Sequence, residues 1–172
     1  MHLCLVRHAI AVERGLPGFE CDYDRPLTEK GRARMREAAA GLQQLFAPEA
    51  VLSSPLVRAR QTAEILLDAY GLRGLHLSDA LATGNDRALF ADVEALGVEN
   101  VIAVGHEPFM SETLAVALTG ERGGLAALFK KGAAALLSFD GAIAPGAARL
   151  EWLVQPAVLR AIAAGHADGE DE

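Results

Sequence analysis

Cysteine is scarce in this chain of 172 residues, which contains only Cys4 and Cys21. Two cysteines without C-x-x-C spacing, one in an apolar run and one in a polar stretch, are typical of reduced thiols rather than of a disulfide framework. Long hydrophobic runs are also lacking, and none approaches the roughly eighteen residues of a membrane-spanning helix. We therefore expect neither a disulfide scaffold nor a membrane partner.

Positive charge is in deficit, with 16 Lys and Arg against 23 Asp and Glu and a formal net charge of −7. Nonspecific nucleic-acid binding depends on clustered positive charge, so this balance argues against a nucleic-acid partner. Among the basic residues of the second half, Arg122, Lys130 and Lys131 are interpreted as solvated surface charges.

Metal-ligand patterns and a secretory signal are missing as well. His2, His76 and His166 have no ligand spacing to a cluster of acids, cysteines or histidines, so no metal site is predicted. An apolar strand begins at residue 2 or 3 and leaves no room for a charged leader segment with a cleavage site. We expect a cytoplasmic protein.

Apolar residues make up 51% of the chain, and its length suffices for one domain with a sizeable core. Neither an internal repeat nor a linker interrupts it. We predict a single domain over residues 1–164 and an acidic, flexible tail over residues 165–172, which ends in Asp-Gly-Glu-Asp-Glu.

The run from Leu3 to Val6 is apolar throughout and stops at Arg7 and His8. Such a run predicts a strand buried on both faces, whose last residue emerges at a sheet edge. In open α/β sheets ligands bind at that edge. Arginine offers a fork of donors to phosphate or carboxylate, and histidine serves as a nucleophile or as an acid or base. The pair indicates phosphate chemistry.

Two further predicted strands are followed closely by a basic residue, Arg58 in one case and His106 in the other. The strand predicted over Ala50 to Ser53 leads into Ser54-Pro55, a start signal for a helix that ends at Gly71 and carries Arg58 one turn in. The strand predicted over Val101 to Val104 leads into Gly105-His106-Glu107-Pro108 and a helix that ends at Gly120.

The other connections have their own patterns. Residues 10–24 form a long loop, Thr28 is a helix N-cap, and apolar positions from Met35 to Phe46 recur at helical spacing. A short strand is expected over residues 75–77, a loop over 79–86 and a helix over 88–96. Strands over 133–139 and 148–154 form a hairpin, and a helix covers 156–164. The fold class is α/β, three layers with a mostly parallel, mixed central sheet.

Taken together, the motifs Val6-Arg7-His8-Ala9, Arg25-Pro26-Leu27-Thr28, Ser53 to Thr62 and Val104 to Pro108 resemble the histidine phosphatase superfamily, whose founding members are phosphoglycerate mutases. The short chain is most similar to its SixA group of phosphohistidine phosphatases. The resemblance covers roughly residues 2–160 and implies a phosphoglycerate mutase-like fold.

The resemblance also implies roles for individual residues. His8 matches the nucleophile that becomes transiently phosphorylated. Arg7, Arg58 and His106 match the residues that hold the phosphoryl oxygens, and Arg25 matches a further arginine of the SixA-like group. Converging cations suit this chemistry, because positioning and electrostatics supply most of phosphoryl-transfer catalysis.

Elementary geometry and electrostatics refine these roles. Arg60 lies about 200° around the helix from Arg58, so only one of the two can face the pocket, and we select Arg58. Neighbouring guanidinium groups lower the pKa of His8 and keep it neutral for attack. His106, facing a phosphate dianion, is expected to be protonated and to donate a hydrogen bond.

Departures from the family pattern concern the proton donor and the loop after the strand. Ala9 replaces the usual glycine, which requires a negative φ at that position. The mutase-like Thr-x-x-Asn segment is absent from residues 9–14, and residues 81–85 lack the glutamate that many relatives place there. The remaining candidates for a proton donor are Asp79, Asp86 and Glu107, of which Glu107 adjoins His106.

A weak or absent donor favours one substrate class. Imidazole leaving a phosphorus–nitrogen bond is far less basic than an alkoxide, since its conjugate acid has a pKa of roughly 6.5, and it needs less proton assistance. We therefore predict hydrolysis of protein N-phosphohistidine, on a phosphotransfer domain or phosphocarrier, with a role in signal transduction. Neither a metal nor an organic cofactor is required.

Two alternatives stay open. One is a phosphatase or mutase for small phosphorylated molecules, which the short chain and the absent Thr-x-x-Asn segment disfavour. The other is a noncatalytic module that binds phosphate or a phosphoprotein, which the presence of His8 together with Arg7, Arg58 and His106 disfavours.

Overall fold

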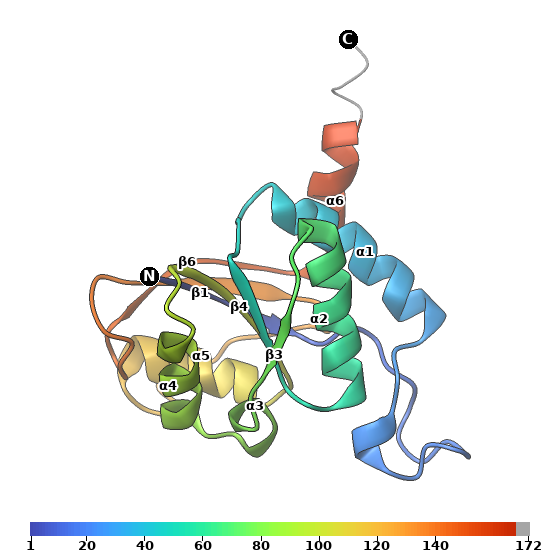
Figure 1. The fold of residues 1–172 in the computed structure, drawn as a ribbon, viewed down its shortest axis with the longest axis horizontal. Coiled ribbons are helices and arrows are strands. Elements are labelled where there is room, and N and C mark those ends of the chain that lie inside the picture. Colours follow the sequence, from blue (N-terminus) through green and yellow to red (C-terminus); the bar gives the residue numbers. More distant parts are fainter. Residues whose placement is uncertain (168–172) are drawn as a thin grey trace.

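A mixed sheet of six strands runs through the centre of the computed structural model, which describes residues 1–167 (Figure 1). The strand order is β3-β2-β4-β1-β5-β6, with parallel pairing among the first four strands of the chain and antiparallel pairing of β5 with β1 and β6. The predicted mixed sheet and C-terminal hairpin are confirmed. The strands are β1 (His2–Arg7), β2 (Ala50–Ser53), β3 (Leu75–Leu77), β4 (Asn100–Gly105), β5 (Ala134–Phe139) and β6 (Ala148–Val154).

Helices cover both faces of the sheet, as the predicted three-layer α/β/α class requires. In Figure 1, α1, α2 and α6 lie on one side and α3, α4 and α5 on the other. A 3₁₀ helix, η1, follows the first strand. The helices are η1 (Asp22–Asp24), α1 (Glu29–Gln43), α2 (Val57–Tyr70), α3 (Ala80–Thr83), α4 (Asp86–Ala95), α5 (Phe109–Thr119) and α6 (Pro156–Ala167).

Residues Leu3 to Val6 of β1 are all apolar, with no alternation of apolar and polar residues, because both faces of this strand are buried. Leu3 and Leu5 belong to the core under α3, α4 and α5, whereas Cys4 and Val6 belong to the core under α1, α2 and α6. All four side chains are fully buried. Strands β4 and β5 pair with its two edges and the two helix layers cover its two faces, so the chain reaches Arg7 and His8 only where the sheet ends.

The start of α1 is fixed against the loop that leaves β1. The Gly31 amide donates to Oγ1 of Thr28 at 2.9 Å, which confirms the predicted N-cap. A Cβ atom on Gly31 would lie 2.0 Å from the carbonyl oxygen of Ile10, so only glycine permits this approach. The loop after His8 is thereby held to the helix.

Three predicted boundaries are wrong. Helix α2 begins at Val57 with Leu56 as its cap, because Ser54 continues the β2 ladder before the chain turns. The segment 79–86, expected as a loop, contains α3, which buries Ala80 and Leu81. Helix α6 continues to Ala167, so the predicted tail boundary at residue 165 falls inside it. The rest of that tail, residues 168–172, lies outside the described residues.

Both cysteines are unpaired, with Cys4 buried in β1 and Cys21 exposed. Burial raises the pKa of the Cys4 thiol far above its usual range, so it does not act as a nucleophile. Within residues 1–167, no helix has both the length and the apolar character needed to cross a bilayer. The same residues contain no group of three or more His, Cys, Asp and Glu side chains suited to a metal ion.

Candidate active site

Strand register brings three site residues together at one edge of the sheet. Arg7 of β1 pairs with Gly105 of β4, and Ser53 of β2 pairs with Val104. The ladder continues one step further, because the amide of His8 donates to the Gly105 carbonyl at 2.9 Å and the amide of Ser54 to the Val104 carbonyl at 3.0 Å. The residues that follow these pairs, His8, Ser54 and His106, therefore leave the sheet side by side.

The ring of His8 is held in one tautomer. Its Nδ1 lies 2.7 Å from the carbonyl oxygen of Ala9, which can only accept, so Nδ1 carries the proton. Its Nε2 accepts from Nε of Arg58 at 3.3 Å. Burial, the neighbouring ring of His106 and the charges of Arg58 and Arg7 lower the pKa of His8 to about 2. The ring is therefore neutral near pH 7, as expected from the neighbouring guanidinium groups, and the free lone pair is on Nε2.

The backbone at Ala9 accommodates a side chain. Its side chain is buried, and no non-glycine residue of the described chain has a positive φ, so the condition set by the sequence is met. The Ala9 amide donates to Oγ1 of Thr62 at 3.0 Å, and that hydroxyl donates to the Arg58 carbonyl at 2.7 Å. Thr62 thus ties the backbone just after His8 to α2.

The choice between the two arginines of α2 is settled by their burial. Arg58 is 4% exposed and contacts His8, whereas Arg60 is exposed on the opposite side of the helix. The helical period requires that only one of the two faces the site, because residues two apart cannot share a face, and the structure identifies it as Arg58.

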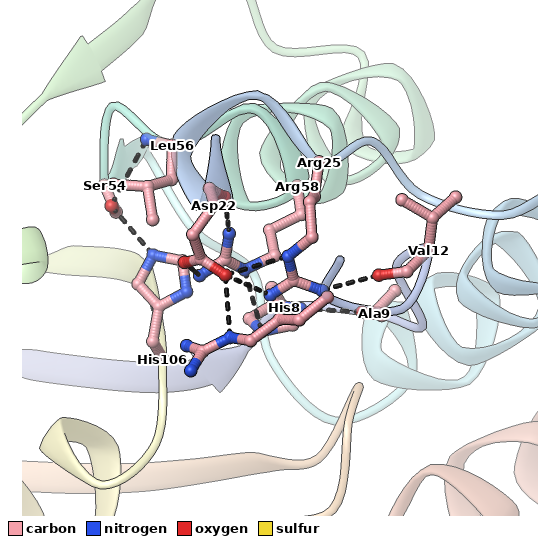
Figure 2. Close-up of polar contacts among 10 residues, drawn as sticks. His8, Ala9, Val12, Asp22, Arg25, Ser54, Leu56, Arg58 and His106 are labelled. Atoms are coloured by element: carbon pink, nitrogen blue, oxygen red, sulfur yellow. Dashed lines mark hydrogen bonds and ion pairs between the residues drawn. The ribbon is translucent and has the colours of Figure 1, made fainter. Parts of the chain in front are cut away.

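Asp22 of η1 is the centre of an arginine cluster that the sequence did not predict (Figure 2). Its Oδ1 lies 2.8 Å from Nε of Arg14 and from Nε of Arg25, and its Oδ2 lies 3.0 Å from Nη2 of Arg58. The Asp22 carbonyl also accepts from Nη1 of Arg58 at 2.7 Å, and Arg25 donates to the Val12 carbonyl at 2.5 Å. Each guanidinium is therefore fixed in direction.

The charge of Asp22 is stabilised by the same contacts. Burial by itself would raise its pKa, but Arg58, Arg25 and Arg14 outweigh burial and lower the pKa below the usual aspartate value. A single carboxylate therefore stands among three guanidinium groups and relieves their mutual repulsion. No local pattern predicts these contacts of Asp22 and Arg14, since neither residue lies in a periodic segment.

Arg7 and His106 are the other nitrogen-bearing side chains that line the cleft with His8 and the arginine cluster. Arg7 donates from Nη1 to the Phe129 carbonyl at 2.6 Å, and its buried Nε has no hydrogen-bond partner among the described residues. His106 contacts the hydroxyl of Ser54 through Nε2 at 2.9 Å, while its buried Nδ1 is likewise unpartnered there. The rings of His8 and His106 are 5.0 Å apart between centroids.

The charges of the protein alone favour a neutral His106, and its protonation opposite a phosphate dianion stays a prediction. Burial, followed by the charges of Arg58, Arg25 and Arg7, lowers its pKa to about 4, although Asp22 acts in the opposite direction. The ring is therefore neutral near pH 7. With the Ser54 hydroxyl donating to Nε2, the neutral ring still presents Nδ1–H as a donor.

The candidate proton donors differ in their placement. Glu107 lines the same cleft as His8, but its Oε2 accepts from the amide and the hydroxyl of Ser111, both at 3.0 Å, and so caps α5. Asp86 accepts from Thr113 and pairs with Arg122. Neither Asp86 nor Asp79 is among the described residues that line the cleft. The role of Glu107 as a donor stays a prediction.

One open cleft contains every predicted site residue. Its described lining also includes residues that the sequence analysis did not place there, because they come from irregular loops. The predicted members are Arg7, His8, Arg25, Arg58, His106 and Glu107, and the others are Ala11, Val12, Glu13, Arg14 and Lys131.

Comparisons with known proteins agree on one family. The model of the histidine phosphatase superfamily (branch 1) matches residues 3–82. An uncharacterized protein of Picosynechococcus sp. is 37% identical over 158 residues, covering 88% of this chain and 89% of the relative. The structure of the protein histidine phosphatase SixA complexed with tungstate superposes with a TM-score of 0.78 at 28% identity, covering 92% of this chain and 99% of that one. A structure from Agrobacterium tumefaciens, assigned as a phosphohistidine phosphatase SixA, gives a TM-score of 0.71 at 27% identity, with 90% and 97% covered.

Proposed function

We propose that this phosphatase, which belongs to the histidine phosphatase superfamily, removes phosphate from phosphohistidine on a protein, with His8 as the transiently phosphorylated nucleophile. The observation that carries the proposal is the state of His8. Its Nδ1 proton is held by the Ala9 carbonyl, and its Nε2 lies against Arg58 in a cleft that Arg7, Arg25 and His106 also line. A neutral ring nitrogen surrounded by donors suits in-line attack on a phosphoryl group.

In the first step, Nε2 of His8 attacks phosphorus while the bond from phosphorus to the substrate imidazole breaks. The hydrogen bond from Arg58 to Nε2 is exchanged for contacts with the phosphoryl oxygens. The unpartnered Nε–H of Arg7 and Nδ1–H of His106 supply further donors to those oxygens. The Ala9 carbonyl stabilises the positive charge that develops on the His8 ring.

The leaving group requires little help from the enzyme. A phosphohistidine whose free ring nitrogen is protonated departs as neutral imidazole, so no acid has to be placed beside it. The low demand for an acid is consistent with this site, where one carboxylate oxygen of Glu107 accepts hydrogen bonds from Ser111. In the second step, water attacks phosphorus while the bond from phosphorus to Nε2 of His8 breaks. The water proton passes to solvent or Glu107, His8 returns to its neutral form, and inorganic phosphate leaves.

A protein substrate also fits the shape of the site. The loop between β1 and α1 lines one side of the cleft, and within residues 1–167 no inserted domain covers it. The similarity to SixA structures supports the same substrate class, at 27% and 28% identity. A phosphatase for small phosphorylated molecules is the second candidate, and it would require Glu107 to protonate an alcohol leaving group.

The test compares three substrates at equal concentration: a phosphotransfer domain phosphorylated on histidine, p-nitrophenyl phosphate and 3-phosphoglycerate. We expect rapid phosphate release from the histidine substrate and slow release from the two phosphomonoesters. Rapid quenching followed by mass spectrometry should find phosphate on His8. Preferred turnover of a phosphomonoester would contradict the substrate assignment but keep His8 as the nucleophile.

The matched control is His8→Asn, because an asparagine amide can still donate toward the Ala9 carbonyl while the nucleophilic nitrogen is removed. We expect turnover of all substrates to be lost with the thermal melt little changed. Phosphate binding without turnover by the unmodified protein would favour the noncatalytic alternative.

A further inference from the structure

A second groove opens beside the His8 cleft, between the first half of α1 and the start of α6. Its floor is largely apolar and includes Met35, Ala38 and Pro156. Four cations line it: Arg34 from α1, Lys130 and Lys131 from the loop before β5, and Arg160 from α6. None of the described residues that line it is acidic.

These cations have few partners of their own. Among residues 1–167, Arg34, Lys130 and Lys131 form no ion pair within 4 Å. Arg160 lies 3.5 Å from a carboxylate oxygen of Glu37, whose side chain is 60% exposed. In a chain whose formal net charge is −7, this groove is a local concentration of unneutralised positive charge.

The groove adjoins the catalytic cleft. Ala9, which follows His8 directly, lines the groove, and Lys131 lines both the groove and the cleft. A polypeptide that places a phosphohistidine against His8 can therefore lay its neighbouring residues into the groove within a few residues of the phosphate.

Building on the proposed function, we infer that this groove docks an acidic segment of the phosphoprotein substrate, next to its phosphohistidine. Carboxylates of the partner would meet Arg34, Lys130 and Arg160 at the rim, and an apolar side chain would cover Met35 and Pro156 on the floor. Charge complementarity favours an acidic partner segment, since the described lining of the groove has four cationic side chains and no acidic one. This revises the interpretation of Lys130 and Lys131 as solvated surface charges. Arg122, by contrast, is paired with Asp86 and Glu112.

The experiment uses two peptides that carry one phosphohistidine flanked on each side by four residues, glutamates in one and glutamines in the other. We expect the full-length protein at low salt to show a value of kcat/KM about tenfold higher for the glutamate peptide, mostly through a lower KM. Free phosphohistidine serves as the substrate that cannot reach the groove.

Two double variants separate the groove from the overall charge of the molecule. Arg34→Glu with Lys130→Glu should abolish the preference for the glutamate peptide and leave turnover of free phosphohistidine unchanged. Arg36→Glu with Arg73→Glu makes the same charge change at exposed positions outside the groove and should retain the preference. Equal loss in both variants would overturn the groove, because it would show a nonspecific effect of net charge.

Other outcomes separate this inference from the proposed function. Turnover of free phosphohistidine and of both peptides at equal kcat/KM would overturn the docking groove and leave the proposed function intact. Failure to hydrolyse any phosphohistidine substrate would overturn both. A dimer in sedimentation that the Arg34→Glu, Lys130→Glu variant dissociates would assign the groove to a second copy of this chain and overturn the acidic partner.

Discussion

Two neighbouring groups of cations in this protein are built in opposite ways. Arg58 and Arg25 in the catalytic cleft are 4% and 8% exposed, and Asp22 binds both. Arg34 and Lys130 in the adjoining groove are exposed and lack an ion pair among residues 1–167. Phosphoryl transfer requires donors whose direction is fixed before the reaction, whereas attraction of a variable acidic surface requires only charge.

The largest expected effect is the loss of a fixed donor. Arg58→Ala should lower kcat for every substrate by about a thousandfold, because it removes a donor to the transferring phosphoryl group from a buried site. Arg60→Ala, two residues along the same helix and exposed, is the matched control and should change kcat less than twofold. Steady-state kinetics of the two variants checks this. Similar losses of kcat in both variants would contradict the claim that a buried arginine of fixed orientation contributes more to catalysis than an exposed one.

A change of pH tests the lowered pKa values of the two histidines in the catalytic cleft. The described lining of the groove contains no histidine. His8 and His106 have pKa values of about 2 and about 4 in the folded protein, below the ordinary value near 6.5. As the pH falls from 6.5 toward 4, the unfolded chain takes up protons that the folded protein does not, so the free energy of unfolding falls.

Each of the two histidines contributes at most about 1.4 kcal/mol per pH unit to that fall. Urea denaturation between pH 7 and pH 4 measures the slope, and His106→Asn should reduce it. NMR titration should show no protonation of the His8 ring above pH 5. A ring that titrates near pH 6.5 would contradict the electrostatic account of the site.

Asp22→Asn alters the carboxylate that distinguishes the buried cations from those of the groove. We expect kcat to fall about tenfold, because Arg25 and Arg58 lose the anion that aligns them. Inorganic phosphate should at the same time inhibit more strongly, because it no longer competes with Asp22 for the guanidinium groups. Product inhibition and kcat are measured together. Asp24→Asn, exposed on the same 3₁₀ helix, should change neither, and an unchanged phosphate inhibition constant in Asp22→Asn would refute the positioning role.

Salt should produce the smallest effect and act on the groove alone. Raising sodium chloride from 50 to 500 mM is expected to lower kcat/KM for the glutamate-flanked peptide about threefold, because exposed charges are screened within a Debye length of a few ångströms. The glutamine-flanked peptide should respond less than half as much. Parallel slopes for the two peptides would place the salt effect in the catalytic cleft.

Local pattern was sufficient to predict much of the fold and the site. The apolar runs that precede Arg7 and Gly105 predicted β1 and β4, and Thr28 predicted the start of α1. The helical period predicted that only one of Arg58 and Arg60 faces the pocket, and the family resemblance favoured Arg58, which contacts His8. These outcomes follow from the periods of helices and strands and from capping signals. Each of these involves only residues that are close together in the sequence.

Other features depended on contacts that no local pattern encodes. Asp22 lies in a segment without periodicity, and only the folded loop shows that it binds Arg14, Arg25 and Arg58. The lowered pKa of His106 in the protein alone is another such feature, because burial and three guanidinium groups distant in sequence set it together.

The sequence by itself determined the sheet, the order of the motifs and the identity of the nucleophile candidate, because strand and helix periods and strand ends are local properties. The tertiary structure alone decided which anion aligns the arginines, how His8 and His106 are ionised, and that α1 and α6 enclose a basic groove beside the site. Electrostatic energy and burial depend on distances through space between residues far apart in the chain, and those distances exist only once the loops have folded.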